Sequence, residues 1–263
     1  MWAIDASRVR EINSEFATNE FGACPPTSCL PPMKIWIAGE IEEVKRAAAT
    51  GLVSAVVTNP AVMARWTAHG QKMEEVCADV CSVTALPLYV QLRGPTTGDF
   101  LREWEHLSKI SPLLRPKFPS TLDGLAATAA VARDGGAALV TTVCSLPQAY
   151  VSAVAGATAT CPYLGRLNDA GEDAATLLQD IATVYSRHAV PTEIIPASVR
   201  SVEDVTIALR AGAHGVIVFW PLFEELLRHP VTTHSLAGFE ANWIEIAHRL
   251  PTADKTLARD NLD

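Results

Sequence analysis

The sequence predicts one α/β domain folded as an eight-stranded (β/α)8 TIM barrel, preceded by an irregular N-terminal arm. After residue 33, short apolar runs rich in β-formers alternate eight times with longer helical patterns. Several helical patterns end in a glycine just before the next apolar run, as at Gly51, Gly135 and Gly212. A glycine stop followed by a buried strand is typical of a βαβ unit. The length of 263 residues also fits a barrel of about 250.

Each predicted strand is almost continuously apolar at its centre, as expected of parallel strands covered on both faces. The predicted strands are 34–39, 54–60, 87–93, 112–118, 137–143, 160–166, 192–198 and 215–220. The clearest helical patterns between them are 40–50, 123–135, 174–188 and 202–213. An open doubly wound sheet commonly has five or six strands, so the strand count favours a closed barrel. No glycine-rich phosphate-binding motif follows any predicted strand, which argues against a nucleotide-binding fold.

The domain organisation follows from a proline-rich stretch near the N-terminus. The first 32 residues end in ACPPTSCLPP, whose four prolines prevent regular structure. We therefore predict an N-terminal extension over 1–32, the barrel over 33–250 and a C-terminal tail over 251–263.

Composition limits the class of partner. The chain is 49% hydrophobic and 19% charged, so it can bury a large core. Its net charge of −8 is spread along the chain without a basic run, which argues against binding to nucleic acid or to a membrane. The N-terminus lacks the pattern of a secretion signal, and we expect a cytoplasmic protein.

The cysteines do not predict a metal centre. Six cysteines in a chain of this length are too few for a disulfide scaffold, and we expect them to be reduced. Cys77 and Cys81 share one face of a helical pattern, but no histidine or second cysteine pair accompanies them. We expect no metal and no cofactor.

Polar residues close six of the predicted strands. Because active sites of such barrels lie at the carboxyl ends of the strands, these residues are candidates for a site. Each alone has a structural explanation as a turn former or helix cap, but their convergence on one barrel mouth favours a functional site. The set is Thr58, Asn59, Gln91, Lys117, Thr141, Thr142, Tyr163, Arg166, Ser198 and Arg200.

Lys117 differs from the other five lysines, which open a strand, lie in helical patterns or belong to the tail. An apolar wall and Arg115, two residues away on the same strand face, are expected to lower the pKa of its amine. A neutral amine attacks carbonyl carbon, and the resulting Schiff base permits carbon–carbon cleavage or formation. The alternative from position alone is a lysine that binds a phosphate or pairs with a carboxylate.

Several segments of the sequence together resemble a known protein family. The segment KFPSTLDGLAA, residues 117–127, resembles the Schiff-base lysine strand and the following helix of the transaldolase family, particularly its small fructose-6-phosphate aldolase-type members. The likeness extends over about residues 33 to 245. It is carried also by VVTNPAVM, YVQLRG, LVTTV, SAVAGATATCPYLGR, IIPASVRSVEDV and FEANW.

The resemblance implies a class I aldolase or transaldolase of carbohydrate metabolism that uses no cofactor. Lys117 would form an imine with a ketose or ketone donor, and the enzyme would cleave, form or transfer a carbon–carbon bond to an aldehyde acceptor. Thr58 and Asn59 would bind the donor. Gln91, Thr141 and Tyr163 would hold a water that acts as the general acid and base. Arg166, Ser198 and Arg200 would contact a phosphate group of the substrate. The small members form rings through their C-terminal helices, so a homo-oligomer is expected.

The chain departs from the family pattern at several positions near the predicted mouth. Ala38 stands where the family usually has an aspartate, and Val57 replaces a threonine. Gly165 replaces an asparagine, and Asn168 replaces an aspartate, with Asp169 one place later. These changes leave the lysine and the acid–base residues in place and predict an altered substrate, phosphorylated or not.

Two alternatives remain at this stage. A catalytically impaired transaldolase-like binding protein would bind ligand without carbon–carbon chemistry, although the retained Lys117, Gln91 and Tyr163 argue against it. A sugar-phosphate isomerase on the same fold would need a carboxylate or histidine base at a strand end, and none of the seven histidines lies at one.

Overall fold

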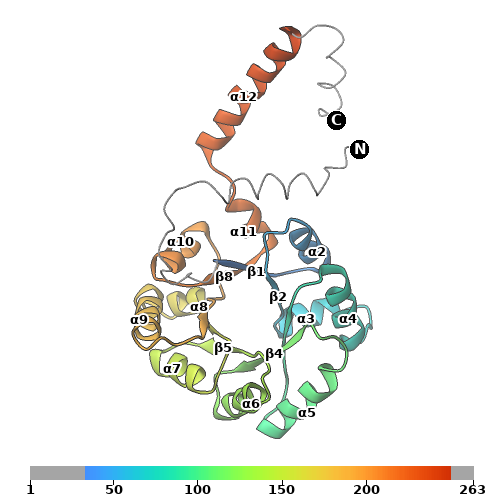
Figure 1. Cartoon of the computed structure of the whole chain (residues 1–263), viewed down its shortest axis with the longest axis vertical. Helices are drawn as coiled ribbons and strands as arrows, with labels where there is room; N and C mark the ends of the chain where they lie inside the picture. The colour runs from blue at the N-terminus through green and yellow to red at the C-terminus, as the bar shows by residue number, and fades with distance from the viewer. Residues whose placement is uncertain (1–32, 250–263) are drawn as a thin grey trace, which may run out of the picture. The chain divides into compact units, whose positions relative to one another are not determined.

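The computed structural model describes residues 33–249, in which eight parallel strands form one sheet (Figure 1). The strands are β1 (Lys34–Ala38), β2 (Ala55–Val57), β3 (Leu88–Gln91), β4 (Leu114–Pro119), β5 (Leu139–Val143), β6 (Ala159–Pro162), β7 (Glu193–Ile194) and β8 (Gly215–Phe219). Their order is β7-β6-β5-β4-β3-β2-β1-β8. The predicted arm, 1–32, and tail, 251–263, lie outside the described residues.

The sheet closes between its two end strands. His214 donates its backbone N–H to the carbonyl of Ile194 at 2.9 Å, and Ile217 donates to Pro196 at 2.9 Å. Most of the helices between residues 41 and 210 form an outer ring around the strands in Figure 1, whereas α12 (Pro230–Arg249) extends away from the ring. The prediction of a (β/α)8 barrel is therefore confirmed.

Side-chain caps mark the start of six of the described helices, five of which are the first helix after a strand. Side chains of Asn59, Thr96, Thr121, Ser145, Asp173 and Ser201 accept a backbone N–H at a helix N-terminus. The helices are α2 (Ile41–Ala49), α3 (Pro60–Trp66), α4 (Met73–Thr84), α5 (Thr97–Leu107), α6 (Leu122–Arg133), α7 (Leu146–Val154), α8 (Leu164–Asp169), α9 (Ala174–Arg187), α10 (Val202–Arg210), α11 (Trp220–Glu225) and α12 (Pro230–Arg249). None of them is long and apolar enough to cross a membrane within 33–249.

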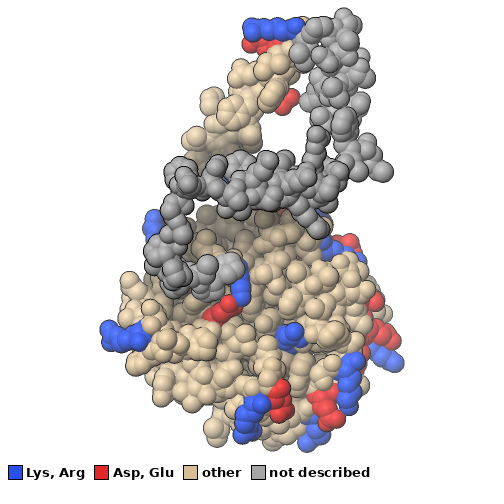
Figure 2. All heavy atoms as spheres, viewed as in Figure 1, with Lys and Arg blue, Asp and Glu red and all other residues tan. Residues whose placement is uncertain are grey.

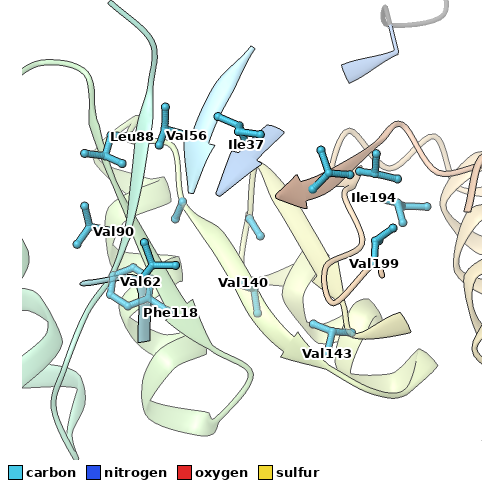
Figure 3. Close-up of a cluster of buried hydrophobic side chains, with 14 of the residues drawn as sticks. Ile37, Val56, Val62, Leu88, Val90, Phe118, Val140, Val143, Ile194 and Val199 are labelled. Atoms are coloured by element: carbon cyan, nitrogen blue, oxygen red, sulfur yellow. The ribbon is translucent and has the colours of Figure 1, made fainter. Parts of the chain in front are cut away.

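The main core lies between the sheet and the helices. Every second strand residue points outward, and Ile37, Val56, Leu88 and Val140 are fully buried there (Figure 3). Burying each such side chain contributes about 1.5–3 kcal/mol relative to leaving it in water. Phe118 on β4 packs edge-on against a phenylalanine of α5, with 5.5 Å between ring centroids. This contact fixes the outward face of the strand that carries Lys117.

A second cluster fills the inside of the barrel. The rings of Trp36 and Tyr89 stack with their centroids 4.6 Å apart and their planes at 15°. Side chains from five strands and from the residue just after β7 complete the cluster: Ala38, Ala55, Val57, Leu139, Ala159, Cys161, Ile195 and Ile217. The barrel interior is thus packed with side chains, and ligands can reach it only at a mouth.

Strands β6 and β7 are shorter than the sequence predicted. We expected a strand over 160–166, but β6 ends at Pro162 and Arg166 lies on α8. The backbone N–H groups of Leu164 and Gly165 bond to the carbonyls of Ala197 and Ser198, both at 3.0 Å, so the chain turns toward the end of β7. Pro196 has no N–H to donate and interrupts the ladder of β7.

The surface carries charges of both signs. Figure 2 shows lysine and arginine interspersed with aspartate and glutamate over the helices on the face in view. This arrangement agrees with the spread of charge along the sequence.

One glycine controls how the lysine strand meets the next helix. A Cβ added to Gly124, in the first turn of α6, would lie 2.1 Å from the carbonyl oxygen of Pro119. We expect Gly124→Ala to lower the free energy of unfolding by about 2 kcal/mol, because the backbone at the end of β4 must shift. Urea denaturation measures this change.

Gly98 provides the matched control. It also lies in the first turn of a helix, α5, but the nearest atom to an added Cβ is the end of the flexible Arg102 side chain at 3.3 Å. Gly98→Ala is expected to be neutral or to stabilise by up to about 1 kcal/mol. Equal effects of the two substitutions would show that the contact with Pro119 is unimportant.

Candidate active site

A cavity of about 200 Å³ opens at the carboxyl ends of the strands. Strands β1, β2, β4 and β8 and the loops after β2, β6 and β7 supply its wall. The lining residues are Ala38, Val57, Thr58, Asn59, Lys117, Tyr163, Arg166, Ala197, Ser198, Ile217 and Phe219. Six of the residues predicted from strand ends therefore meet at one place.

Lys117 is the buried amine of this cavity. Its side chain points into the barrel mouth from β4, and only 3% of the residue is exposed. The amine Nζ donates to the carbonyl oxygen of Thr58 at 3.0 Å. Burial lowers the pKa of the Lys117 amine, and the nearby Cys161 thiol opposes this shift to a smaller extent. A carbonyl oxygen accepts from a neutral amine as well as from an ammonium, so this geometry suits a nucleophile.

Arg115 does not contribute to this shift, contrary to expectation. Its Nη1 atom donates to the carbonyls of Pro112 and Leu114, both at 2.6 Å. The guanidinium thus turns toward the amino end of β4, while Lys117 lies near the carboxyl end. The lowered pKa of Lys117 follows from burial rather than from a neighbouring positive charge.

The end of β2 orients Asn59. The amide oxygen of Asn59 accepts the N–H of Val62 at 2.8 Å and so caps α3. Because the oxygen is used by the cap, the NH2 group is the part of the amide that can donate to a ligand in the cavity. The hydroxyl of Thr58 is instead held between β2 and β3, where it accepts the N–H of Gln91 at 3.3 Å.

Tyr163 lines the cavity and forms a polar pair with Thr141, which is not itself part of the lining. The Thr141 hydroxyl donates to the Tyr163 hydroxyl at 3.1 Å. Burial raises the pKa of Tyr163, so its phenol stays protonated. The Gln91 side-chain oxygen is buried and has no hydrogen-bond partner among the described residues. A buried amide oxygen without a partner is the environment in which an ordered water is expected.

The part of the wall next to Tyr163 carries a positive charge. Arg166 on α8 lies over the ring of Tyr163, with 5.0 Å between its guanidinium carbon and the ring centroid. Ser198 lines the cavity beside it. Arg200 was also predicted here, but it is not part of the lining; its guanidinium forms two hydrogen bonds of 2.7 Å with the carboxylate of Asp169.

Two non-glycine residues near the mouth have left-handed backbone conformations. Thr142 has φ of 59° and Ser198 has φ of 57°, which is unusual, and for a β-branched residue costs on the order of 1–3 kcal/mol. Thr142 is the extra residue where the β5–β6 register shifts, and its hydroxyl accepts the N–H of Ser120 at 3.2 Å. This bulge lets Val140 and Val143 both face the helices while Thr141 stays inside (Figure 3).

Sequence reasoning missed part of the wall. Ala197, Ile217 and Phe219 line the cavity, and they join Ala38 and Val57 in an apolar sector formed largely by β8, β1 and β2. Phe219 closes β8, so a search of all strand ends, rather than of polar ones, could have found it. Ile217 lies within an apolar strand, where no sequence signal separates it from the core.

The chain is similar to a described protein family and to several known proteins. A family model described as "Transaldolase/Fructose-6-phosphate aldolase" matches residues 110–262. A "Probable transaldolase" of Pelotomaculum thermopropionicum is 34% identical over 215 residues, which cover 81% of this chain and 99% of the relative. The chain belongs to the transaldolase/fructose-6-phosphate aldolase family. It is an enzyme of the transaldolase or aldolase type, and the predicted resemblance is confirmed.

Further relatives agree with this membership. "Probable transaldolase 1" of Listeria monocytogenes is 36% identical, covering 77% of this chain and 94% of the relative. A "Probable transaldolase" of a Caulobacter species is 38% identical, covering 74% and 89%. A solved structure, thiamine phosphate pyrophosphorylase from Pyrococcus furiosus, matches 71% of this chain and 85% of that one, with a TM-score of 0.50 and 13% identity, and so shows the fold alone. Neither alternative, the binding protein or the isomerase, is favoured by these matches.

Burial of Lys117 predicts a pH-dependent cost to stability. Its folded pKa lies below the unfolded value of about 10.4, so the unfolded state binds more protons between these two values. Stability therefore falls as the pH drops through this window. We expect Lys117→Met to be more stable than the wild type at neutral pH, by about 1 kcal/mol or more, and the difference to shrink as the pH approaches about 10.4.

Chemical denaturation at a series of pH values measures this difference. The exposed Lys109 is the control, and Lys109→Met is expected to stay within about 0.5 kcal/mol of the wild type. A Lys117→Met variant that is less stable at neutral pH would contradict the burial cost.

Proposed function

We propose that this enzyme is a class I aldolase or transaldolase in which Lys117 forms an imine with a ketose or ketone donor. The observation that supports this most strongly is an amine that is 3% exposed, bonded to a backbone carbonyl and directed into the mouth cavity. Among the described lining residues no carboxylate is present to hold the amine in its charged form. A base of lowered pKa in a concave site is a candidate nucleophile.

The reaction begins when the amine attacks the donor carbonyl and its proton passes to the carbonyl oxygen, which gives a carbinolamine. The carbinolamine hydroxyl then takes up a second proton and leaves as water, which gives the protonated imine. The next bond to break joins the carbon beside the imine to the hydroxyl-bearing carbon after it. Its electron pair moves toward the imine nitrogen to give an enamine, the hydroxyl gives up its proton, and an aldehyde leaves. The remaining enamine either takes a proton and is hydrolysed, as in an aldolase, or attacks a second aldehyde, as in a transaldolase.

Proton transfers in these steps are assigned to Gln91, Thr141 and Tyr163. The Thr141–Tyr163 hydrogen bond supports a shared water that carries protons between the donor oxygens and the enzyme. The Gln91 side-chain oxygen, which has no hydrogen-bond partner within residues 33–249, supports it as well. Because Tyr163 stays protonated, its phenol can donate to an oxygen that gains negative charge.

Substrate contacts are assigned to the remaining polar wall. The Asn59 NH2 group would donate to a donor hydroxyl, and the carbonyl of Thr58 holds the amine before reaction. Arg166 and Ser198 would contact an anionic group such as the phosphate of a sugar phosphate, for which a guanidinium fork is well suited. Arg200 contributes to this contact only if it leaves Asp169.

The proposal includes a catalytic domain over 33–250 and a cytoplasmic homo-oligomer in carbohydrate metabolism. α12 has no buried residue, and it exposes Leu236, Phe239 and Trp243 by 59%, 58% and 65%. Such a helix can pack on a second copy. A solution mass equal to one chain would exclude the oligomer.

The imine can be trapped directly. Incubation with dihydroxyacetone, hydroxyacetone or fructose 6-phosphate followed by borohydride is expected to leave a reduced adduct on Lys117, located by peptide mass mapping. The amine is nucleophilic because its pKa is lowered by burial.

Lys117→Met is the control and should give no adduct. Trapping at a different lysine, or none with any of the three donors, would contradict the imine mechanism. Ligand binding without any adduct would instead favour the binding-protein alternative.

A further inference from the structure

In the part of the chain that the structure describes, Arg200 is paired with a carboxylate, that of Asp169, whereas Arg166, the other arginine predicted to bind an anion, is not. Asp169, the last residue of α8, accepts two hydrogen bonds of 2.7 Å from the Arg200 guanidinium, one on each oxygen. Arg200 is held a second time because its backbone N–H donates to Asp204 at 2.8 Å. A two-pronged arginine–carboxylate contact fixes orientation as well as position.

Gly165 shows how close this pair is to the cavity. A Cβ built on Gly165 would lie 3.0 Å from Nε of Arg200 and 3.1 Å from the hydroxyl oxygen of Ser198, which lines the cavity. It would also lie 2.3 Å from the Ser198 carbonyl oxygen. The Arg200 stem therefore lies immediately beside the wall, while its guanidinium points to Asp169.

Among the residues that the structure describes, the cavity lining therefore contains one guanidinium, that of Arg166. Arg166 lines the cavity and lies over Tyr163, and no carboxylate occurs among the described lining residues. Asp169 has both arginines in its surroundings, since Arg200 and Arg166 both help to lower its pKa. The three side chains together carry a net charge of about +1, whereas two free arginines would carry about +2.

We propose that Asp169 is a specificity-determining residue: it holds the Arg200 guanidinium away from the cavity, so that the site favours substrates with one negative charge or none over phosphate dianions. This inference rests on the proposed function, because it concerns the anion-binding wall of the same site. A single guanidinium matches a carboxylate with two hydrogen bonds, but it leaves a third phosphate oxygen without a charged donor.

Inorganic phosphate tests this without turnover. Calorimetric titration at about pH 8, where phosphate is mostly a dianion, is carried out at low ionic strength so that charges are not screened. Asp169→Asn is expected to bind phosphate about five-fold more tightly than the wild type, because one opposing charge is lost and Arg200 becomes free. The double variant Asp169→Asn/Arg200→Gln is expected to return to the weak wild-type affinity.

Asp180→Asn is the matched control, since it removes one exposed carboxylate from the neighbouring helix α9 and should leave phosphate binding unchanged. Equal phosphate affinities in Asp169→Asn and the wild type would overturn the inference. Tight binding that persists in the double variant would overturn it too, because Arg200 would then be irrelevant.

A second readout separates this inference from the proposed function. For any donor that labels Lys117, the ratio of kcat/KM for glyceraldehyde 3-phosphate to that for glyceraldehyde should rise in Asp169→Asn by a similar factor. Labelling of Lys117 with an unchanged ratio and unchanged phosphate affinity would refute the role of Asp169 alone. Absence of labelling, with tighter phosphate binding in Asp169→Asn, would refute the imine mechanism alone.

Discussion

A lysine amine that has no counter-charge is stable in a dry protein interior only when it can give up its proton. Lys117 meets this condition, because its surroundings are the end of a packed barrel, a backbone carbonyl and a wall without carboxylates among the described residues. The rest of the mouth is consistent with this constraint. Tyr163 stays protonated for the same reason, and Cys161 stays a neutral thiol because burial raises its pKa.

The fold excludes water from the barrel interior and fixes the positions of the side chains at the mouth. Trp36 and Tyr89 stack inside the barrel and belong to the buried cluster that fills its interior below the mouth. Gly124 and the cap at Thr121 fix the exit of β4, while the bulge at Thr142 keeps Thr141 inside. On the anionic side, Gly165 lets the loop after β7 approach α8 closely, and Asp169 then holds Arg200. The positions of the active-site side chains therefore depend on these backbone contacts as well as on the catalytic residues themselves.

Much of this arrangement could be predicted from sequence, because repeated apolar strands and glycine stops are local signals. The position of Lys117 at a strand end was enough to select it, and the family motifs supplied its neighbours. Other features depend on three-dimensional contacts. The early end of β6 follows from hydrogen bonds between Gly165 and the distant Ser198, and the pairing of Arg200 with Asp169 joins residues 31 positions apart. The orientation of Arg115 away from Lys117 was likewise invisible, because a strand pattern gives the face of a side chain but not which end of the strand a long side chain reaches.

The central claim is that burial, without help from a neighbouring positive charge, lowers the pKa of the Lys117 amine below its ordinary value. The most direct test is an NMR pH titration of lysine side chains labelled at Cε, with the Lys117 signal assigned by its loss in Lys117→Met. The account predicts that Lys117 titrates well below the ordinary value of about 10.4. A Lys117 that titrates at or above about 10.4 would contradict it.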